Sequence, residues 1–134
     1  MAKILIVEDD PLISRMYQRV FGFEGFDVEM ARNGQEGIDK AKESKPTIML
    51  LDIMMPKKTG IDVLKELKAD ENLKGVPVII LTNLSSMEDA ETAIELGAVK
   101  FIIKSDNKPT EVVKQVREIL KASSRDELPT GSKK

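Results

Sequence analysis

Five short apolar runs recur along this 134-residue chain, and each is followed by a longer stretch whose apolar residues recur at helical spacing. These runs occupy residues 3–7, 26–30, 47–51, 78–81 and 99–103. Alternation of this kind is typical of parallel strands joined by crossover helices, which cover both faces of the sheet. We therefore expect an α/β fold, a doubly wound five-stranded parallel sheet with five helices.

Polar side chains stand at the ends of four of these runs. They are Glu8 and Asp9 after the first run, Asp52 after the third, Thr82 after the fourth and Lys104 after the fifth. Because the carboxyl ends of parallel strands meet at one edge of an open sheet, these side chains should gather where such folds bind ligands. Two carboxylates about 4 Å apart repel by roughly 4 kcal/mol at an effective dielectric of about 20, so a metal ion or a lysine must offset the charge. The set predicts a magnesium-assisted phosphoryl-transfer site built around one nucleophilic aspartate.

Composition narrows the class of protein. A chain of 134 residues, 41% hydrophobic and 33% charged, makes one domain and leaves no room for a second. The net charge of -2 gives no reason to expect a nucleic-acid or membrane surface. The chain has no cysteine and no long apolar segment, and Met1-Ala2-Lys3 leads directly into the first run. We therefore expect a cytoplasmic protein without a signal peptide.

Histidine is also absent. Its absence excludes a histidine base, a histidine phosphodonor and the usual zinc ligands within this chain. A metal ion here must be held by oxygen atoms, which favours Mg²⁺, with Mn²⁺ as the alternative.

Helical spacing also predicts which residues face the sheet. The first helix begins at Pro11, with Asp10 or Asp9 as its N-cap. Its inner stripe comprises Leu12, Ile13, Met16, Tyr17, Val20 and Phe21. The fourth helix turns inward Met87, Ala90, Ala93 and Ile94. The last helix begins at Pro109, and from residue 123 onward we expect a disordered tail or a linker.

Four segments, in this order, carry a resemblance to a known family. They are Glu8-Asp9-Asp10-Pro11, Leu51-Asp52-Ile53-Met54-Met55-Pro56-Lys57-Lys58-Thr59-Gly60, Leu81-Thr82 and Gly97-Ala98-Val99-Lys100-Phe101-Ile102-Ile103-Lys104. Together they resemble the receiver domain of bacterial two-component response regulators over about residues 3–121. The resemblance implies a flavodoxin-like sheet with strand order 2-1-3-4-5. It also implies that residues 1–122 form the receiver domain and residues 123–134 a tail or linker.

The resemblance implies a magnesium site at the acidic cluster. Asp52 is then the phosphoacceptor and a metal ligand, Asp9 binds Mg²⁺ directly, and Glu8 binds it through water. The backbone carbonyl of Met54 supplies a further ligand. This assignment agrees with the chemistry of a strand-end carboxylate, which can attack phosphorus to form an acyl phosphate. Asp10 is better explained as the cap of the first helix.

Thr82 and Lys104 complete the implied site, because their hydroxyl and ammonium groups would bind the oxygens of a phosphoryl group on Asp52. The resemblance couples movement of Thr82 to Phe101 and to repacking of the face formed by the fourth helix, the last strand and the last helix. A buried core position is the alternative interpretation of Phe101, one of only five aromatic residues.

Four positions depart from the usual pattern of the family. Asn83 replaces a small residue and leaves the preference among phosphodonors open. Ser105 replaces a proline that is joined by a cis bond, so we expect a trans bond and a differently shaped loop over residues 105–108, because a non-proline cis bond costs roughly 3 kcal/mol. Met54 and Leu84 are apolar where polar side chains in relatives position the attacking water, so they should affect the lifetime of the phosphoryl group.

The predicted function is a phosphorylation-controlled signalling switch. A histidine kinase or a phosphotransfer protein would supply the phosphoryl group, and the chain would catalyse its own phosphorylation and dephosphorylation without being a conventional turnover enzyme. An interaction module that signals without phosphorylation is the alternative, for which Asn83 and Ser105 are the only hints. An FMN-binding flavin carrier is disfavoured, because Glu8-Asp9-Asp10 would repel the flavin phosphate. We expect the chain to act on a downstream target, whose identity the sequence does not predict, and to make no direct contact with nucleic acid or membrane.

Overall fold

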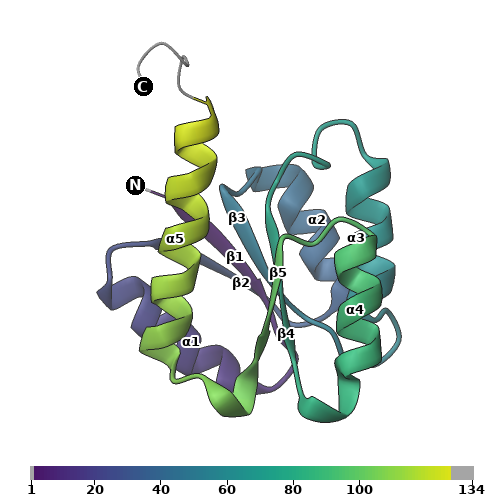
Figure 1. Ribbon diagram of the computed structural model, residues 1–134, viewed down its shortest axis with the longest axis horizontal. Coiled ribbons are helices and arrows are strands. Elements are labelled where there is room, and N and C mark those ends of the chain that lie inside the picture. Colours follow the sequence, from purple (N-terminus) through teal and green to yellow (C-terminus); the bar gives the residue numbers. More distant parts are fainter. Residues whose placement is uncertain (1, 128–134) are drawn as a thin grey trace.

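Five parallel strands form one sheet in the order β2-β1-β3-β4-β5 (Figure 1). The computed structural model describes residues 2–127, with side chains described for residues 2–122. The strands are β1 (Lys3–Val7), β2 (Asp27–Ala31), β3 (Ile48–Asp52), β4 (Val78–Thr82) and β5 (Lys100–Ile103). The predicted fold class and strand order are confirmed, and the bounds agree with the predicted runs to within one residue.

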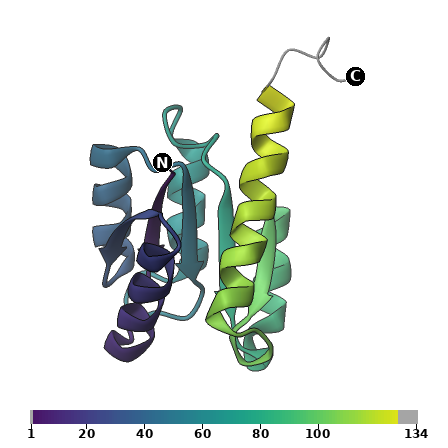
Figure 2. The ribbon, with the colours of Figure 1, turned by 90° about the vertical axis from the view of Figure 1, so that its left-hand side faces the viewer.

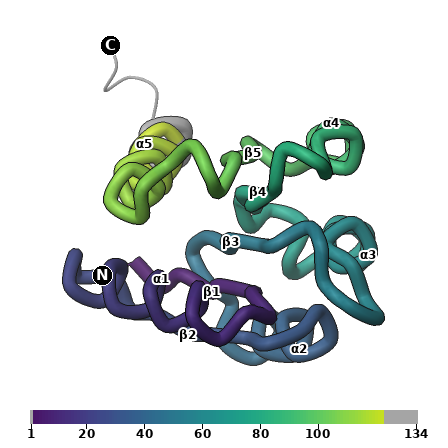
Figure 3. Tube along the Cα trace, turned by 90° about the horizontal axis from the view of Figure 1, so that it is seen from below, coloured from purple at the N-terminus to yellow at the C-terminus, as the bar shows by residue number. Residues whose placement is uncertain are grey.

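Helices cover both faces of this sheet. They are α1 (Pro11–Phe23), α2 (Gly34–Ser44), α3 (Gly60–Ala69), α4 (Met87–Glu95) and α5 (Pro109–Glu127). Figure 2 shows α1 and α5 on the face turned toward the viewer, and Figure 3 shows α2, α3 and α4 on the opposite side. Short 3-10 turns, Leu84–Ser86 and Lys104–Asp106, follow β4 and β5. Each of the helices α1 to α4 carries the chain back to the start of the next parallel strand.

The apolar side chains of the strands alternate between two cores. In β1, Ile4 and Ile6 face the core under α1 and α5, whereas Leu5 and Val7 face the core under α2, α3 and α4. All four side chains are fully buried. Because successive side chains of a strand point to opposite faces, a strand covered on both sides needs a continuous apolar run. This requirement explains the uninterrupted runs at β1, β3 and β4.

The register of the sheet brings the strand ends to one level. Val7 of β1 is paired with Leu51 of β3, so the next residues, Glu8 and Asp52, are neighbours. Asp52 is in turn paired with Leu81 of β4. The residues predicted to form the site therefore stand along one edge of the sheet.

Three residues that the sequence predicts to face inward are exposed instead. They are Leu12 at 75%, Met16 at 39% and Ile94 at 39% exposure. The arc that faces the sheet is narrower than predicted, since α1 buries only Tyr17 and Phe21 and α4 buries only Ala90 and Ala93. Each helix rests on the sheet from one side, so only about one side chain per turn reaches the core.

Helix α5 runs to Glu127, past residue 122 where the sequence predicts the folded domain to end. Residues 128–134 of the predicted tail lie outside the described residues, and the division at residue 122 stays a prediction. Among the described helices, none combines the length and apolar composition needed to span a membrane. The cytoplasmic location also stays a prediction.

Gly60 allows the loop after β3 to close against the strand. A Cβ atom at this position would lie 2.7 Å from the Asp52 carbonyl oxygen and 2.7 Å from the Cα atom of Ile53. The Gly60 amide donates a hydrogen bond to the Ile53 carbonyl at 2.9 Å. A capping box between Thr59 and Asp62 fixes the start of α3 at the same point. The backbone after Asp52 is therefore held against the strand that carries this aspartate.

We expect Gly60→Ala to lower the free energy of unfolding by about 2 kcal/mol, because a methyl group has no room between these two backbone segments. Gly75→Ala is the matched control, since nothing lies within 4 Å of a Cβ atom built there. Urea unfolding of the two variants measures the difference. Equal stability of the variants would contradict the close approach at Gly60.

Candidate functional site

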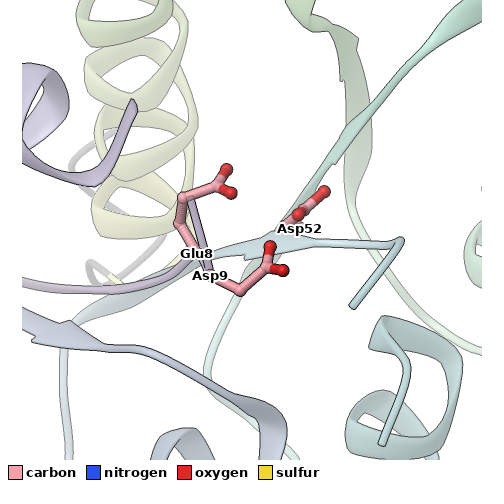
Figure 4. A group of neighbouring side chains, drawn as sticks. All are labelled: Glu8, Asp9 and Asp52. Atoms are coloured by element: carbon pink, nitrogen blue, oxygen red, sulfur yellow. The ribbon is translucent and has the colours of Figure 1, made fainter. Parts of the chain in front are cut away.

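Three carboxylates gather at the carboxyl edge of the sheet (Figure 4). Glu8 and Asp9 follow β1, Asp52 ends β3, and each offers an oxygen atom within 4.8 Å of the others. Glu8 is 1% exposed and Asp52 is 3% exposed, whereas Asp9 is exposed to solvent. Three negative charges at this separation, two of them buried, require positive charge nearby.

Asp10 caps α1 and leaves Asp9 out of the cap. The side chain of Asp10 accepts hydrogen bonds from the amide of Leu12 at 2.9 Å and the amide of Ile13 at 3.3 Å. The amide of Asp10 donates to Glu8 Oε2 at 3.1 Å and so orients that carboxylate. Of the two N-cap candidates in the sequence, the structure selects Asp10.

Lys104 supplies positive charge to the cluster. Its ammonium nitrogen lies 3.1 Å from Glu8 Oε1 and 3.1 Å from Asp52 Oδ1. The lysine follows β5, so its side chain reaches past the end of β4 to the ends of β3 and β1. A single ammonium group thus bridges the two buried carboxylates.

Burial and charge shift the pKa values in this cluster. Burial, together with the neighbouring Asp52 carboxylate, raises the pKa of Glu8 from 4.5 to about 7. Burial also raises the pKa of Asp52, although the Lys104 ammonium opposes the rise. Burial acts to lower the pKa of Lys104, but the two facing carboxylates raise it overall. Among the described residues, the positive charge in contact with the cluster is smaller than its negative charge near neutral pH, which favours uptake of a proton or a further cation.

The donor set of the cluster fits a divalent cation. Carboxylate oxygens are the ligands that Mg²⁺ and Mn²⁺ prefer, and the sequence holds no histidine or cysteine to favour a softer metal. The single positive charge of Lys104 balances only one of the three negative charges that the ionised carboxylates would carry. The acidic cluster can therefore hold Mg²⁺.

Thr82 comes one residue after Leu81, the partner of Asp52 in the sheet, and Phe101 lies within β5. Thr82 ends β4 and is fully buried, and its hydroxyl oxygen lies 3.0 Å from the Asn83 carbonyl oxygen and 3.3 Å from the Ser86 carbonyl oxygen. The hydroxyl therefore donates within its own turn. Phe101 is partly buried against the core under α2, α3 and α4, and both interpretations of this residue, core and switch, stay open.

The two apolar positions predicted to affect the phosphoryl lifetime lie in the loops after β3 and β4. Met54 is 51% exposed and Leu84 is 64% exposed. The Met54 amide donates to Asp52 Oδ1 at 3.4 Å, which places this residue beside the aspartate. Both side chains therefore stand at the solvent side of the loops that border the site.

Asn107, which bridges the turn after β5, was not predicted from the sequence. Asn107 follows the turn that begins at Lys104, and its side-chain amide donates to the Ile103 carbonyl at 3.0 Å. The expected trans geometry over residues 105–108 is confirmed, since the described residues contain no cis peptide bond. Ser105 is the signal that could have pointed to Asn107, because serine does not fix its backbone angle as proline does.

The family model of the response regulator receiver domain matches residues 4–117 of this chain. The chain belongs to this family. The receiver domain is 37% identical over 95% of its length to the probable transcriptional regulator ycf27 of Porphyridium aerugineum, and 39% identical over 92% of its length to the CpxR homolog of Haemophilus influenzae. It covers 53% and 52% of these proteins, so the chain spans about half the length of the curated relatives it matches.

Solved structures share the fold of this receiver domain. The CheY-like receiver domain protein of Methanospirillum hungatei has a TM-score of 0.86 and 27% identity, over 94% of this chain and 98% of that one. A signal receiver domain of a histidine kinase from Syntrophus aciditrophicus has a TM-score of 0.84 and 32% identity, over 97% and 98% of the two chains. Receiver domains of response regulators interact with histidine kinases or phosphotransfer proteins. One relative is named as a DNA-binding response regulator, and the lack of nucleic-acid contact by this chain stays a prediction.

We expect the contribution of Glu8 to the free energy of unfolding of the metal-free receiver domain to fall as the pH rises from 4.5 to about 7. In this window the folded protein keeps on Glu8 a proton that the unfolded chain has released, so the stabilisation is complete below pH 4.5 and is lost as the pH passes about 7. The change corresponds to roughly 3 kcal/mol, because one pKa unit is worth about 1.4 kcal/mol. Urea unfolding across this pH range, with a chelator present, measures it.

Glu8→Gln removes the titrating group, so the difference between its profile and that of the wild type contains the titration of Glu8 and the response of the neighbouring Asp52 carboxylate. Glu43→Gln, an exposed carboxylate on α2, is the matched control. A profile for Glu8→Gln as steep as that of the wild type would contradict the raised pKa of Glu8.

Proposed function

We propose that this receiver domain is a phosphorylation-controlled signalling switch that accepts a phosphoryl group on Asp52. The observation that carries the proposal is the buried Asp52 carboxylate, which lies in the acidic cluster and contacts the Lys104 ammonium. Among the described carboxylates, Asp52 combines a strand-end position with nearby cation ligands and a lysine contact. A histidine kinase or a phosphotransfer protein supplies the phosphoryl group, in line with the family.

Phosphoryl transfer requires an ionised Asp52. One carboxylate oxygen attacks phosphorus, an O–P bond forms as the P–N bond of the donor phosphohistidine breaks, and the electron pair of that bond stays on the imidazole nitrogen. Burial raises the pKa of Asp52, and the Lys104 ammonium 3.1 Å from Oδ1 opposes this and favours the ionised form. The same ammonium reduces the repulsion between the aspartate and the anionic donor.

The metal site of the proposal uses the residues of the acidic cluster. Mg²⁺, or Mn²⁺ as the alternative, would be held by Glu8, Asp9, Asp52 and the Met54 carbonyl. When bound, the metal would neutralise charge on the phosphoryl oxygens. Glu8, whose pKa is about 7, must lose its proton before it can act as a ligand, directly or through water.

Thr82 and Lys104 would bind the phosphoryl oxygens after transfer. To do so, the Thr82 hydroxyl must leave the carbonyl oxygens of its own turn. That movement would shift the 3-10 turn at the start of α4 and change the packing of Phe101, which is only partly buried. The α4-β5-α5 face would then present a different surface to an unidentified target.

We expect acetyl phosphate with Mg²⁺ to add one phosphoryl group to the wild-type chain and none to Asp52→Asn, because an amide cannot form the acyl phosphate. Intact mass spectrometry measures the incorporation. Asp27→Asn, at the amino end of β2, is the matched control and should behave as the wild type. Incorporation into Asp52→Asn at the wild-type level would show that another residue accepts the phosphoryl group. A wild-type chain that takes up no phosphoryl group would favour a module that signals without phosphorylation.

Asp9→Ala tests the metal part of the same proposal. This carboxylate is exposed, so its removal leaves no buried cavity and the fold should be retained. We expect weaker Mg²⁺ binding by calorimetry and slower phosphorylation. Unchanged affinity for magnesium in this variant would mean that the ion binds at another place.

We expect the phosphorylated receiver domain to be long-lived compared with receivers that carry polar side chains at positions 54 and 84. Met54 and Leu84 offer no hydrogen bond that could orient the attacking water. Met54→Asn and Leu84→Lys should therefore speed the loss of the phosphoryl group, on the order of threefold to tenfold. The decay of the phosphorylated mass after removal of the donor measures the rate.

Phe23→Asn is the matched control for lifetime, because Phe23 is an 88% exposed apolar residue at the far end of α1. It should leave the decay unchanged. If the wild-type phosphoryl group is lost within seconds and neither site variant alters that rate, apolar shielding does not govern the lifetime.

A further inference from the structure

The turn that carries Lys104 lies at the open edge of the sheet. β5 is an edge strand, and its ladder with β4 ends at the pair Thr82 and Ile103. Lys104 comes one residue later, in the 3-10 turn Lys104–Asp106, beyond the last paired residues of β4 and β5. Its side chain must nevertheless hold a fixed direction, because it contacts two carboxylates at 3.1 Å each. Other interactions must therefore hold this turn.

The backbone closes the turn only weakly. The amide of Asn107 lies 3.5 Å from the Lys104 carbonyl oxygen, at the long limit of a hydrogen bond, and the turn has no side-chain cap. The side chain of Asn107 provides the shorter contact, since its amide nitrogen donates to the Ile103 carbonyl at 3.0 Å. This bond spans the whole turn, from the residue before Lys104 to the residue after Asp106.

A second hydrogen bond ties the same side chain to α5. Gln115 Nε2 donates to Asn107 Oδ1 at 3.1 Å. The orientation of the Asn107 amide follows from its partners, because the Ile103 carbonyl can only accept and so must face the nitrogen. The oxygen is then left for Gln115.

Helix α5 is a rigid support for this contact. Its first turn is held by the bond from the Lys108 amide to Glu111 Oε1 at 2.8 Å. Val112 and Val116, on either side of Gln115 along the helix, are buried in the core under α1 and α5. The link Ile103–Asn107–Gln115 therefore joins the end of the edge strand to a helix that is anchored in the core.

We propose that Asn107 is a positioning residue for Lys104, and that Gln115 supports it. By clamping the turn to α5, Asn107 keeps the Lys104 ammonium on Asp52 and Glu8, and later on the phosphoryl oxygens. The second part of this inference rests on the proposed function. The first part concerns the unphosphorylated protein and stands without it.

Side-chain mobility tests the first part directly. NMR relaxation of the Lys104 Cε group, in the metal-free and unphosphorylated protein, should report a more mobile side chain in Asn107→Ala than in the wild type. Lys68 is an internal reference in the same spectra, because its ammonium is held by the Lys74 carbonyl at 3.1 Å far from the turn. Gln35→Ala, which removes a comparable side-chain bond to Asp39 on α2, should leave Lys104 unchanged.

Two further variants separate the roles within the link. Asn107→Asp keeps the acceptor for Gln115 but has no donor for the Ile103 carbonyl, so it should loosen Lys104 as Asn107→Ala does. Gln115→Ala leaves the bond across the turn in place and should have a smaller effect. Unchanged Lys104 mobility in both Asn107 variants would overturn the proposal.

A double-mutant cycle tests the second part. In Asn107→Ala, phosphorylation of Asp52 by acetyl phosphate should slow about tenfold, because a displaced ammonium no longer meets the reacting groups. Once Lys104→Ala has been introduced, the further change Asn107→Ala should have no effect on the rate. An additional tenfold loss in the double variant would show that Asn107 does not act through Lys104, and would overturn the proposal.

The two proposals fail in different ways. If the wild type takes up no phosphoryl group on Asp52, the proposed function fails while Lys104 mobility still decides the positioning role. If the wild type is phosphorylated and Lys104 keeps its mobility without Asn107, only the positioning role fails.

Discussion

Two buried carboxylates share one partly buried ammonium group at the edge of this sheet, and the negative charge that remains sets the properties of the site. Lys104 contacts Glu8 and Asp52 at 3.1 Å each, and Asp9 adds a third negative charge nearby. A buried carboxylate without full compensation is costly, which is why the pKa of Glu8 rises to about 7. The cluster is balanced only by a proton or by another cation. Under the proposed function, this imbalance is what favours Mg²⁺ beside the nucleophilic aspartate.

In the loops around the cluster, the backbone is held by residues that neighbour the functional side chains. Asp10 caps α1, so Asp9 is not used for that purpose. Gly60 lets the loop after β3 pack against the backbone of that strand, where a Cβ atom would have no room. Asn107 spans the turn that begins at Lys104. In each case the hydrogen bonds that a loop requires are made by a residue other than the one that does the chemistry.

The sequence predicts most of this site because topology leaves little choice. Parallel strands place their carboxyl ends at one edge, so Glu8, Asp52 and Lys104 were expected along the same edge once the strand positions were known. Side-chain directions were harder to predict. The Thr82 hydroxyl bonds to its own turn, and Leu12 of α1 is exposed, because both depend on which neighbours the folded chain supplies.

The sequence by itself determined the α/β class, the positions of the strands and the residues that stand at their ends. Those features follow from short continuous apolar runs and from apolar residues at helical spacing, which each segment carries locally. Only the tertiary structure decided that Lys104 bridges Glu8 and Asp52, that the pKa of Glu8 is raised, and that Asn107 supports the turn. These features depend on burial and on distances between segments, as for Lys104 and Glu8, which are 96 residues apart in the chain. Electrostatic energy is set by separation in space, so no local pattern in the sequence contains it.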